Sequence, residues 1–414
     1  MSAPMTLDVE RARRDTPGCA EILHFNNAGS SLMPDPVLRA TVGHLELEAR
    51  IGGYEAAARE EEALERVYGA TARMLGCAPD EIAVVENATR AWDMAFYSIP
   101  FGPGDRILTA QAEYASNYIA YLQVARKTGA VVEPVPSDER GRISVSALRD
   151  MMDERVKLVA ITHVPTNGGL VNPAKEVGEV ARESGCLYLL DVCQSAGQMP
   201  LDVGEIGCDM LSATGRKYLR GPRGTGFLYV RREVLERLEP PFLDLHAAEW
   251  TASDQFEIRP DARRFENWET NFAGKIGLGV ALDYALDIGL EAIRERVYAL
   301  AERLRVRLAS IPGVVVRDLG EERCGIVTFT AEGRRPDEIK GALAARAINV
   351  SIASPASTLL DSEERGLGEI VRASVHYFNT DDEIERFCAT LGEVLSSGRP
   401  DNDRGAGSTV SPLP

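Results

Sequence analysis

SATGRKYLRGPRGTG (residues 212–226) places Lys217 between a run of small residues and a glycine-rich turn, directly after a segment predicted to be a strand. A lysine in this setting is compatible with three roles: binding a phosphate, lying in solvent, or acting as a nucleophile. The P-loop pattern for phosphate binding is not matched, because Tyr218 follows the lysine where serine or threonine is required. A solvent-exposed lysine fits poorly with the small residues before it, which indicate a close approach of the backbone to another group.

Short apolar runs alternate with amphipathic segments around this stretch. The runs at 82–87, 105–110, 156–164 and 186–192 are typical of buried strands, and helix-like segments lie between them. This alternation predicts an α/β fold with a mostly parallel central sheet that helices cover on both faces. Sheets of this kind bind ligands at the carboxyl ends of their strands, so we expect the functional residues there.

A segment from Pro36 to about Leu75 has helical periodicity that is interrupted at Gly52 and Gly53.

The alternation of strand-like and helix-like segments ends at about residue 274, and a longer helical run then covers 276–311. Strand-like segments and a further helix follow this run, which predicts a smaller α+β domain. The expected organisation is an N-terminal arm (1–22), a large domain (23–274), a small C-terminal domain (275–395, with an approximate boundary) and a disordered tail rich in Gly, Pro and Ser (396–414).

Composition excludes several classes of protein. The 414 residues suffice for two domains, and 44% hydrophobic and 26% charged residues are ordinary for a globular protein. A formal net charge of -17 argues against nucleic acid and anionic membranes as partners. No long apolar run and no signal-peptide core are found. Seven scattered cysteines and five histidines lack disulfide-framework or metal-ligand spacing, so a cytoplasmic protein without a metal site is expected.

Asp191 closes the apolar run 186–192, and Lys217 follows one predicted strand later. A carboxylate at the end of an apolar strand is costly unless it has a partner, although a helix cap or a hydrogen-bonded aspartate is also compatible with the position. An aspartate and a lysine on adjacent strand ends suit pyridoxal 5'-phosphate. The lysine forms an imine with this cofactor, and the aspartate keeps its pyridine nitrogen protonated.

Other strand ends supply the remaining contacts that this cofactor requires. A phosphate binds well at a helix N-terminus, and Ala88 and Thr89 begin the helix-like segment after 82–87. The other candidates are a hydroxyl and a cation near the phosphate (Thr214, Arg216), an aromatic ring to stack on the cofactor (Tyr114) and a donor to its phenolic oxygen (Gln194).

Eight motifs extend this interpretation to a family. With them, the chain resembles the class V aminotransferase family of fold-type I pyridoxal-phosphate enzymes, which includes cysteine desulfurases, isopenicillin N epimerase-like proteins and C–S lyases of ergothioneine-type pathways. The likeness covers roughly residues 22–395 and implies the fold-type I transferase fold. The motifs are HFNNAGSSLMP, ENATRAW, AEYASN, THVPTNGGLVNP, DVCQSAGQMPLDV, SATGRKYLRGPRGTGFLYV, RRFENWETNFA and VRASVHYFNTDDEI.

The resemblance implies specific roles for residues of this chain. Lys217 is similar to the Schiff-base lysine of the family and Asp191 to the partner of the pyridinium. Arg372 matches the arginine that receives the substrate carboxylate, a role that suits a bidentate guanidinium, and Asn27 lies near that carboxylate. The implied cofactor-binding residues are Ala88, Thr89, Tyr114, Asn167, Asp191, Gln194, Thr214, Arg216 and Lys217.

Two positions stay open in this comparison. Thr166 and Asn167 both compete for the polar position beside the phenolic oxygen. The linker after Lys217 is one residue longer than the desulfurase pattern, so Arg220 and Arg223 either line the pocket or face solvent. The resemblance also implies a homodimer whose active site lies at the interface, because the region NWETNFA (267–273) approaches the neighbouring subunit in the family.

The expected reaction follows from one departure from the family. Cysteine desulfurases carry a cysteine on the loop before the carboxylate-binding arginine, whereas residues 348–372 contain none. Because a persulfide requires a thiol, we expect a C–S lyase that performs β-elimination on a cysteine S-conjugate, with Lys217 removing the α-proton, and not a persulfide-forming cysteine desulfurase. An aminotransferase, an amino-acid epimerase that uses Tyr114 as a second acid, and a non-catalytic binding protein of this fold are the alternatives.

Overall fold

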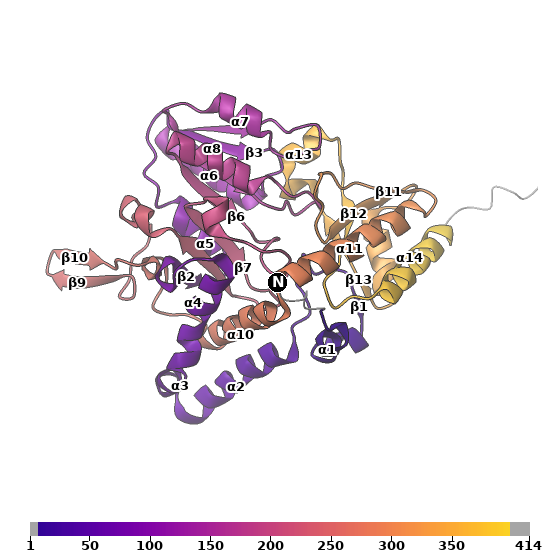
Figure 1. Cartoon of the computed structure of the whole chain (residues 1–414), viewed down its shortest axis with the longest axis horizontal. Helices are drawn as coiled ribbons and strands as arrows, with labels where there is room; N and C mark the ends of the chain where they lie inside the picture. The colour runs from indigo at the N-terminus through magenta and orange to yellow at the C-terminus, as the bar shows by residue number, and fades with distance from the viewer. Residues whose placement is uncertain (1–6, 398–414) are drawn as a thin grey trace, which may run out of the picture.

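The computed structural model describes residues 7–397 and has the expected α/β architecture (Figure 1). A seven-stranded sheet has the order β2-β8-β7-β6-β5-β3-β4, and β8 alone runs antiparallel to its neighbours. The prediction of a mostly parallel central sheet is therefore confirmed. Its strands are β2 (Ile82–Val85), β3 (Arg106–Ala110), β4 (Val131–Val135), β5 (Val156–Thr162), β6 (Leu187–Asp191), β7 (Met210–Thr214) and β8 (Gly226–Val230).

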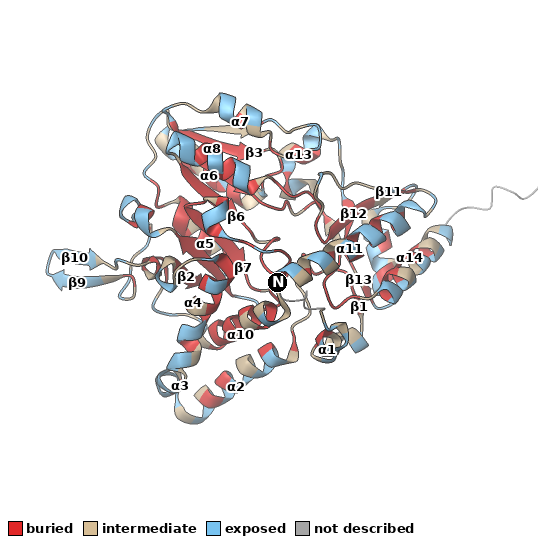
Figure 2. Cartoon of the chain, viewed as in Figure 1, coloured by how far each residue is buried: buried red, intermediate tan, exposed pale blue. Residues whose placement is uncertain are grey.

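Two separate cores bury the central strands, one on each face of the sheet, and Figure 2 shows these strands as buried. Leu187 and Leu189 of β6 share a core with residues of α5 (Ala88–Phe96) and α6 (Ala115–Thr128). Tyr188 and Leu190 share the other core with residues of α8 (Ala174–Ser184). Because side chains alternate between the faces of a strand, a strand covered on both faces is apolar throughout. This explains why the central strands read as continuous apolar runs.

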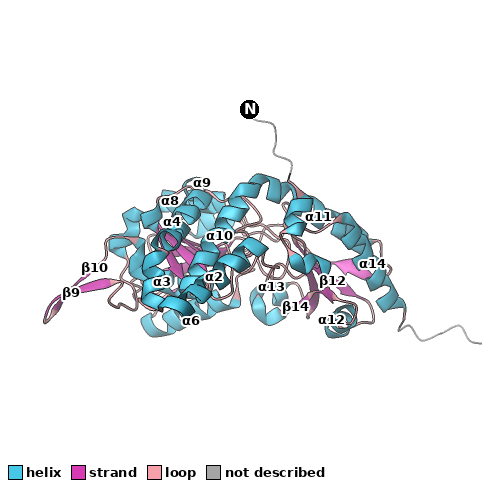
Figure 3. Cartoon of the chain, turned by 90° about the horizontal axis from the view of Figure 1, so that it is seen from below, coloured by secondary structure: helices cyan, strands magenta, loops and turns pink. Residues whose placement is uncertain are grey.

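Most of the remaining helices of the N-terminal two thirds surround this sheet, as Figure 3 shows from a second direction, whereas α1 (Val9–Arg14) lies against the C-terminal part of the chain, where Arg13 pairs with Glu383 (Figure 1). No helix within residues 7–397 is long and apolar enough to span a membrane. A hairpin of two further strands, β9 (Ala248–Ala252) and β10 (Gln255–Ile258), projects away from the body (Figures 1 and 3). The helices are α1 (Val9–Arg14), α2 (Asp35–Ile51), α3 (Gly53–Arg59), α4 (Glu61–Leu75), α7 (Val145–Met151), α9 (Val203–Ile206) and α10 (Phe272–Ile288).

Glycines with positive φ determine where two long helical segments are divided. The predicted interruption after α2 is confirmed, because the helix ends at Ile51 and Gly52 has φ +96°. The single helix expected over 276–311 is instead two helices, α10 and α11 (Leu290–Ala309), separated by Gly289 with φ +93°. A side chain with a Cβ is disfavoured at such φ values, so glycine at these positions permits the change of direction.

The C-terminal part contains a four-stranded antiparallel sheet in the order β11-β12-β15-β14. The segment after the predicted arm lies beside this part of the chain, because β1 (Leu23–His24) pairs in parallel with β13 (Ile348–Asn349). Residues 398–414 of the predicted tail lie outside the described residues. The elements are β11 (Val314–Val316), β12 (Ile326–Ala331), α12 (Pro336–Ala344), β14 (Ser351–Ala353), α13 (Leu359–Glu364), β15 (Ile370–Ser374) and α14 (Asp381–Ser396).

Candidate active site

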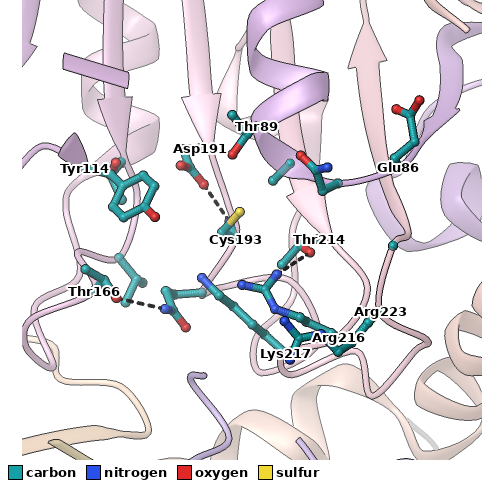
Figure 4. Close-up of a pocket in the computed structure, with 16 residues that line it drawn as sticks. Glu86, Thr89, Tyr114, Thr166, Asp191, Cys193, Thr214, Arg216, Lys217 and Arg223 are labelled. Atoms are coloured by element: carbon teal, nitrogen blue, oxygen red, sulfur yellow. Dashed lines mark hydrogen bonds between the residues drawn. The ribbon is translucent and has the colours of Figure 1, made fainter. Parts of the chain in front are cut away.

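The carboxyl ends of the parallel strands meet at one cavity of about 490 Å³ (Figure 4). Segments that follow β2, β3, β5, β6 and β7 all contribute to its lining, as expected for a sheet of this topology. Of the residues predicted from the sequence, the structure brings together Ala88, Thr89, Tyr114, Asp191, Gln194, Thr214, Arg216 and Lys217 around this cavity.

Lys217 lies in the loop after β7, and its side chain points into the cavity (Figure 4). Burial lowers the pKa of its ammonium group; Arg216 and Arg372 act in the same direction, whereas Cys193 and Asp191 oppose it. A lysine with a lowered pKa holds a larger fraction of neutral amine, which is the form that acts as a nucleophile or a base. The position therefore favours the nucleophilic role over the solvent-exposed one.

Asp191 ends β6 with only 5% of its surface exposed. Its Oδ1 accepts a hydrogen bond from the Cys193 backbone N–H at 2.8 Å, and its Oδ2 accepts one from Asn117 Nδ2 at 3.1 Å. No ion pair within residues 7–397 involves this carboxylate. A buried carboxylate without a cationic partner is costly, so the site suits a ligand that carries a positive charge at this point. The protonated pyridine nitrogen of pyridoxal phosphate fits this requirement.

The N-terminus of α5 also lines the cavity. Asn87 is its N-cap, and the Asn87 side chain accepts a hydrogen bond from Arg90 N–H at 2.9 Å. The backbone N–H groups of the first helical residues, Ala88 and Thr89, lack intrahelical partners by geometry, and free N–H groups at a helix N-terminus favour an anion. Thr214 Oγ1 accepts a hydrogen bond from Arg216 Nη1 at 2.9 Å, which holds the guanidinium at the cavity. This group of donors fits a phosphate.

Gly226, the last residue of the segment 212–226, permits close packing between backbone segments of the chain. A Cβ on Gly226 would lie 2.6 Å from the Ala213 carbonyl oxygen and 2.8 Å from the Asn87 carbonyl carbon. Glycine at this position therefore lets β8 begin directly against the N-cap of α5. The close backbone approach expected near Lys217 thus includes contacts that shape the phosphate end of the cavity.

Thr166, and not Asn167, lines the cavity. Thr166 Oγ1 accepts a hydrogen bond from Gln194 Nε2 at 3.3 Å. Asn167 Nδ2 donates instead to the Ser354 carbonyl oxygen at 2.8 Å and to Thr358 Oγ1 at 2.9 Å. The structure thus separates the two residues that the sequence left as alternatives.

Arg372 lies behind Thr166 and does not line the cavity itself. Its Nη1 donates to the Thr166 carbonyl oxygen at 3.0 Å and to Thr166 Oγ1 at 2.7 Å, while its buried Nε has no partner among residues 7–397. Burial lowers the pKa of this guanidinium. Asn27 is fully buried, and its side chain is bonded to Ser374 O at 2.7 Å and Ser31 Oγ at 2.8 Å. Arg372 therefore keeps one N–H donor, at Nε, without a partner among residues 7–397. The side chain of Asn27, in contrast, makes its hydrogen bonds to Ser374 and Ser31 and not to the cavity.

The two arginines of the longer linker have different positions. Arg223 is exposed and lines the cavity. Arg220 is fully buried away from it, where it donates to Leu32 O at 2.8 Å and to the Tyr377 hydroxyl at 2.7 Å. Arg220 adopts φ +62°, which is unfavourable for a residue with a Cβ. Its contacts thus hold the loop after Lys217 against the N-terminal and C-terminal segments.

Several lining residues were not predicted from the sequence, namely Glu86, Asn87, Thr162, Val164, Cys193 and Gly224. Asn87 had a recognisable signal, because asparagine directly before a helix-like segment is a common N-cap. Glu113 and Asn117, which approach Asp191, were also missed. They are four residues apart, a spacing that places two side chains on the same face of a helical turn, but nothing local indicates that they meet a strand end 74 residues away.

Comparisons with known proteins identify the family. The family model described as Aminotransferase class-V matches residues 23–387. A probable cysteine desulfurase of Methanothermobacter thermautotrophicus is 32% identical over 94% of this chain and 98% of its own length. One from Xylella fastidiosa is 31% identical over 94% and 96%. A solved cysteine desulfurase from Thermococcus onnurineus has a TM-score of 0.87 at 27% identity, covering 96% of this chain and 100% of that one.

These relatives correct the predicted reaction. The expectation of β-elimination from a cysteine S-conjugate, with transamination or epimerisation as alternatives, excluded the cysteine desulfurases, and this is wrong. The curated relatives reported above are named as probable cysteine desulfurases, and the Thermococcus structure is a cysteine desulfurase. The exclusion depended on one loop without a cysteine, whereas the likeness extends over nearly the entire chain.

The identity of the cofactor does not depend on that loop. The half-buried lysine, the aspartate without an ion-pair partner among residues 7–397 at the neighbouring strand end and the helix N-terminus together fit pyridoxal phosphate, the cofactor of the matched family. The chain belongs to the class V aminotransferase family of pyridoxal-phosphate-dependent enzymes.

Proposed function

We propose that this enzyme removes the sulfur atom from L-cysteine, the activity for which its relatives are named. The observation that supports the proposal most is the pairing of Lys217 with Asp191, a half-buried lysine of lowered pKa beside a buried carboxylate without an ion-pair partner among residues 7–397. Pyridoxal phosphate, when bound, supplies an electron sink for negative charge at the substrate α-carbon.

In this proposal, each end of the cavity binds one part of the cofactor. Asp191 holds the ring nitrogen, and the α5 N-terminus with Thr214 and Arg216 binds the phosphate. The exposed ring of Tyr114 covers the cofactor, and Gln194, whose Nε2 donates to Ala28 O at 3.1 Å and to Thr166 Oγ1 at 3.3 Å, is the donor proposed for the phenolic oxygen. Asn167 and Asn27 support this arrangement through their internal hydrogen bonds.

We propose two roles for Lys217, both at its Nζ atom. Its Nζ binds the cofactor before the substrate arrives, and afterwards, as a neutral amine, it accepts the α-proton and returns it. Burial favours the neutral amine because it lowers the pKa of the ammonium group. Removal of this side chain therefore affects both binding and proton transfer.

Arg372 is proposed to bind the substrate carboxylate. It is buried, no ion pair within residues 7–397 involves it, and its Nε has no partner there. A guanidinium holds a carboxylate with two parallel hydrogen bonds, which a lysine cannot reproduce.

Arg372→Lys should raise the KM for L-cysteine by about 10- to 100-fold, because the charge remains and the bidentate contact is lost. We expect a smaller change in kcat, measured by steady-state kinetics. Arg317→Lys, at an arginine whose Nε donates to Thr330 Oγ1 at 2.9 Å, is the matched control. An unchanged KM in Arg372→Lys would show that the substrate carboxylate binds elsewhere.

The sulfur atom needs an acceptor thiol. Cys193 is the one cysteine that lines the cavity, and all seven cysteines lie within the described residues. Burial raises the pKa of its thiol, an effect that the neighbouring Asp191 reinforces, so the thiol is protonated at neutral pH and a weak nucleophile. A thiol from outside the chain is therefore the proposed acceptor. The carbon–sulfur bond of cysteine breaks, hydrogen replaces sulfur at the β-carbon to give alanine, and the acceptor thiol becomes a persulfide.

Cys193→Ser should keep the rate of sulfur release within about twofold of the unmodified enzyme. Serine retains the backbone N–H that donates to Asp191 and removes only the thiol. The rate is measured with an excess of an external thiol. A loss of release of more than about tenfold, with cofactor still bound, would identify Cys193 as the sulfur acceptor.

The proposed activity is tested by incubating cofactor-loaded protein with L-cysteine and an excess of thiol, and by measuring sulfide and persulfide over time. Release of many sulfur atoms per cofactor supports the proposal. D-cysteine is the control, because a fixed carboxylate contact orients only one enantiomer for proton removal by Lys217. Fully loaded protein that releases no sulfur from L-cysteine would contradict it.

A homodimer is proposed from the exposed aromatic surface. Trp250 and Phe256 on the β9–β10 hairpin are 73% and 55% exposed, and Trp268 in the NWETNFA region is 56% exposed. Large exposed aromatic side chains are typical of protein interfaces, and the family resemblance points to a second copy of this chain as the partner. Sedimentation should give twice the chain mass, and a monomer at micromolar concentration would contradict the proposal.

A cytoplasmic location is proposed from the cysteines. All seven are free in the structure, which suits a reducing compartment.

A further inference from the structure

Glu113 and Asn117 form a buried polar link to Asp191. Glu113 follows β3, and Asn117 lies in the first turn of α6; both are 3% exposed. Asn117 Nδ2 donates to Glu113 Oε1 at 3.0 Å and to Asp191 Oδ2 at 3.1 Å. One amide nitrogen carries two protons, so it can serve both carboxylates at once. The two carboxylates are thus joined through a single side chain.

Glu113 is held in place from several directions. Its Oε1 also accepts the Tyr114 backbone N–H at 2.7 Å and the Thr162 hydroxyl, and its Oε2 accepts the Thr109 hydroxyl at 3.0 Å. Tyr114 and Thr162 line the cavity. The carboxylate of Glu113 therefore connects two cavity residues with the amide that orients Asp191.

This cluster is short of positive charge. No ion pair within residues 7–397 involves Glu113 or Asp191. Burial, together with the nearby Asp191, raises the pKa of Glu113, while the hydrogen bonds from Thr162 and Asn117 lower it, and the net result is a pKa of about 7. Two buried carboxylates without a cation stabilise any positive charge that enters beside them. A protonated ring nitrogen next to Asp191 is such a charge.

We propose that Glu113 and Asn117 are positioning residues that orient the Asp191 carboxylate toward the ring nitrogen of the cofactor and help to keep that nitrogen protonated. The inference rests on the proposed binding of the cofactor ring by Asp191. Asn117 fixes the direction of Oδ2, and Glu113 adds a second negative charge behind it. A purely structural role, in which the cluster only ties α6 to the sheet, would leave the interaction with the ring nitrogen unchanged.

The two roles differ in their effect on one atom of the ligand. We would measure the dissociation constants of pyridoxal phosphate and of its 1-deaza analogue, in which a carbon replaces the ring nitrogen, for the whole protein freed of cofactor. The ratio of the two constants reports the contribution of the ring nitrogen alone, because both ligands make the other contacts. Loss of fold stability affects both ligands and cancels in the ratio.

The variants are Glu113→Gln, which removes the second charge, and Asn117→Ser, which breaks the link. Each should reduce the preference for pyridoxal phosphate over the analogue by about tenfold. Asp93→Asn is the matched control, since this half-buried carboxylate of α5 also has a pKa raised by burial but does not line the cavity. Thermal melting without ligand identifies any variant that fails to fold, and the other variant then decides.

The outcomes separate this inference from the proposed function. A preference that falls in either folded variant and stays constant in Asp93→Asn supports it. An unchanged preference for pyridoxal phosphate over the analogue in both variants, or an equal fall in Asp93→Asn, overturns the positioning role of Glu113 and Asn117. The proposed binding of the cofactor by Asp191 is not affected by that result. If the unmodified protein binds pyridoxal phosphate no better than the analogue, the proposed role of Asp191 fails, and this inference fails with it.

Discussion

Lys217→Ala should lose at least about 10⁴-fold of its sulfur release from L-cysteine, because the variant lacks both the amine that binds the cofactor and the base at the α-carbon. Lys217 is the lysine that lines the cavity, and burial there favours its neutral form. The rate is measured with pyridoxal phosphate in excess, so that weaker cofactor binding does not by itself explain the loss.

Chemical labelling tests the same residue without a variant. Borohydride reduction of the loaded protein, followed by mass spectrometry, should place the cofactor on Lys217. Lys275 is an internal control, because it is also buried with a lowered pKa but lies in a different cluster, beside Tyr68 and Glu266. A label on Lys275, or on any lysine other than Lys217, would contradict the assignment.

Asp191→Asn should retain the cofactor and lose about 10³-fold in kcat, which corresponds to about 4 kcal/mol of transition-state stabilisation. A neutral amide has nearly the same shape, but it does not stabilise a protonated ring nitrogen, so the ring accepts electrons less well. Cofactor content and steady-state rates are measured on the same preparation, which separates loss of binding from loss of chemistry.

Asp209→Asn is the matched control for this change. Asp209 is equally buried, but it lies beside the start of β6, where it accepts the Tyr188 backbone N–H at 2.8 Å and pairs with Arg231. We expect a loss of stability in this control and a near-normal kcat. A near-normal kcat in Asp191→Asn would show that the ring nitrogen does not depend on this carboxylate.

The sequence predicted the parts of the site that each follow directly from one strand end. Asp191, Lys217 and the Ala88–Thr89 helix start could be found because a strand, its last residue and the next helix are local patterns, and a parallel sheet brings its carboxyl ends together. The sheet was predictable for the same reason: strands covered on both faces are apolar throughout.

The rest of the site could not be predicted, because it depends on contacts between segments that are far apart in the sequence. Asn117 meets Asp191 because α6 packs on the face of the sheet next to β6, and no spacing in the sequence encodes that distance. Thr166 and Asn167 are neighbours in the chain, and the loop at Ser354 determines which of them faces the cavity. The reaction was mispredicted because it was inferred from one absent thiol.

We propose that the enzyme leaves alanine when it takes sulfur from L-cysteine. Loaded enzyme is supplied with ¹³C-labelled L-cysteine and an excess of thiol, and the labelled products are quantified together with the released sulfur. The account predicts one alanine for each sulfur atom released, with the same ratio in Cys193→Ser. Labelled pyruvate in place of alanine, at one per sulfur atom, would contradict it.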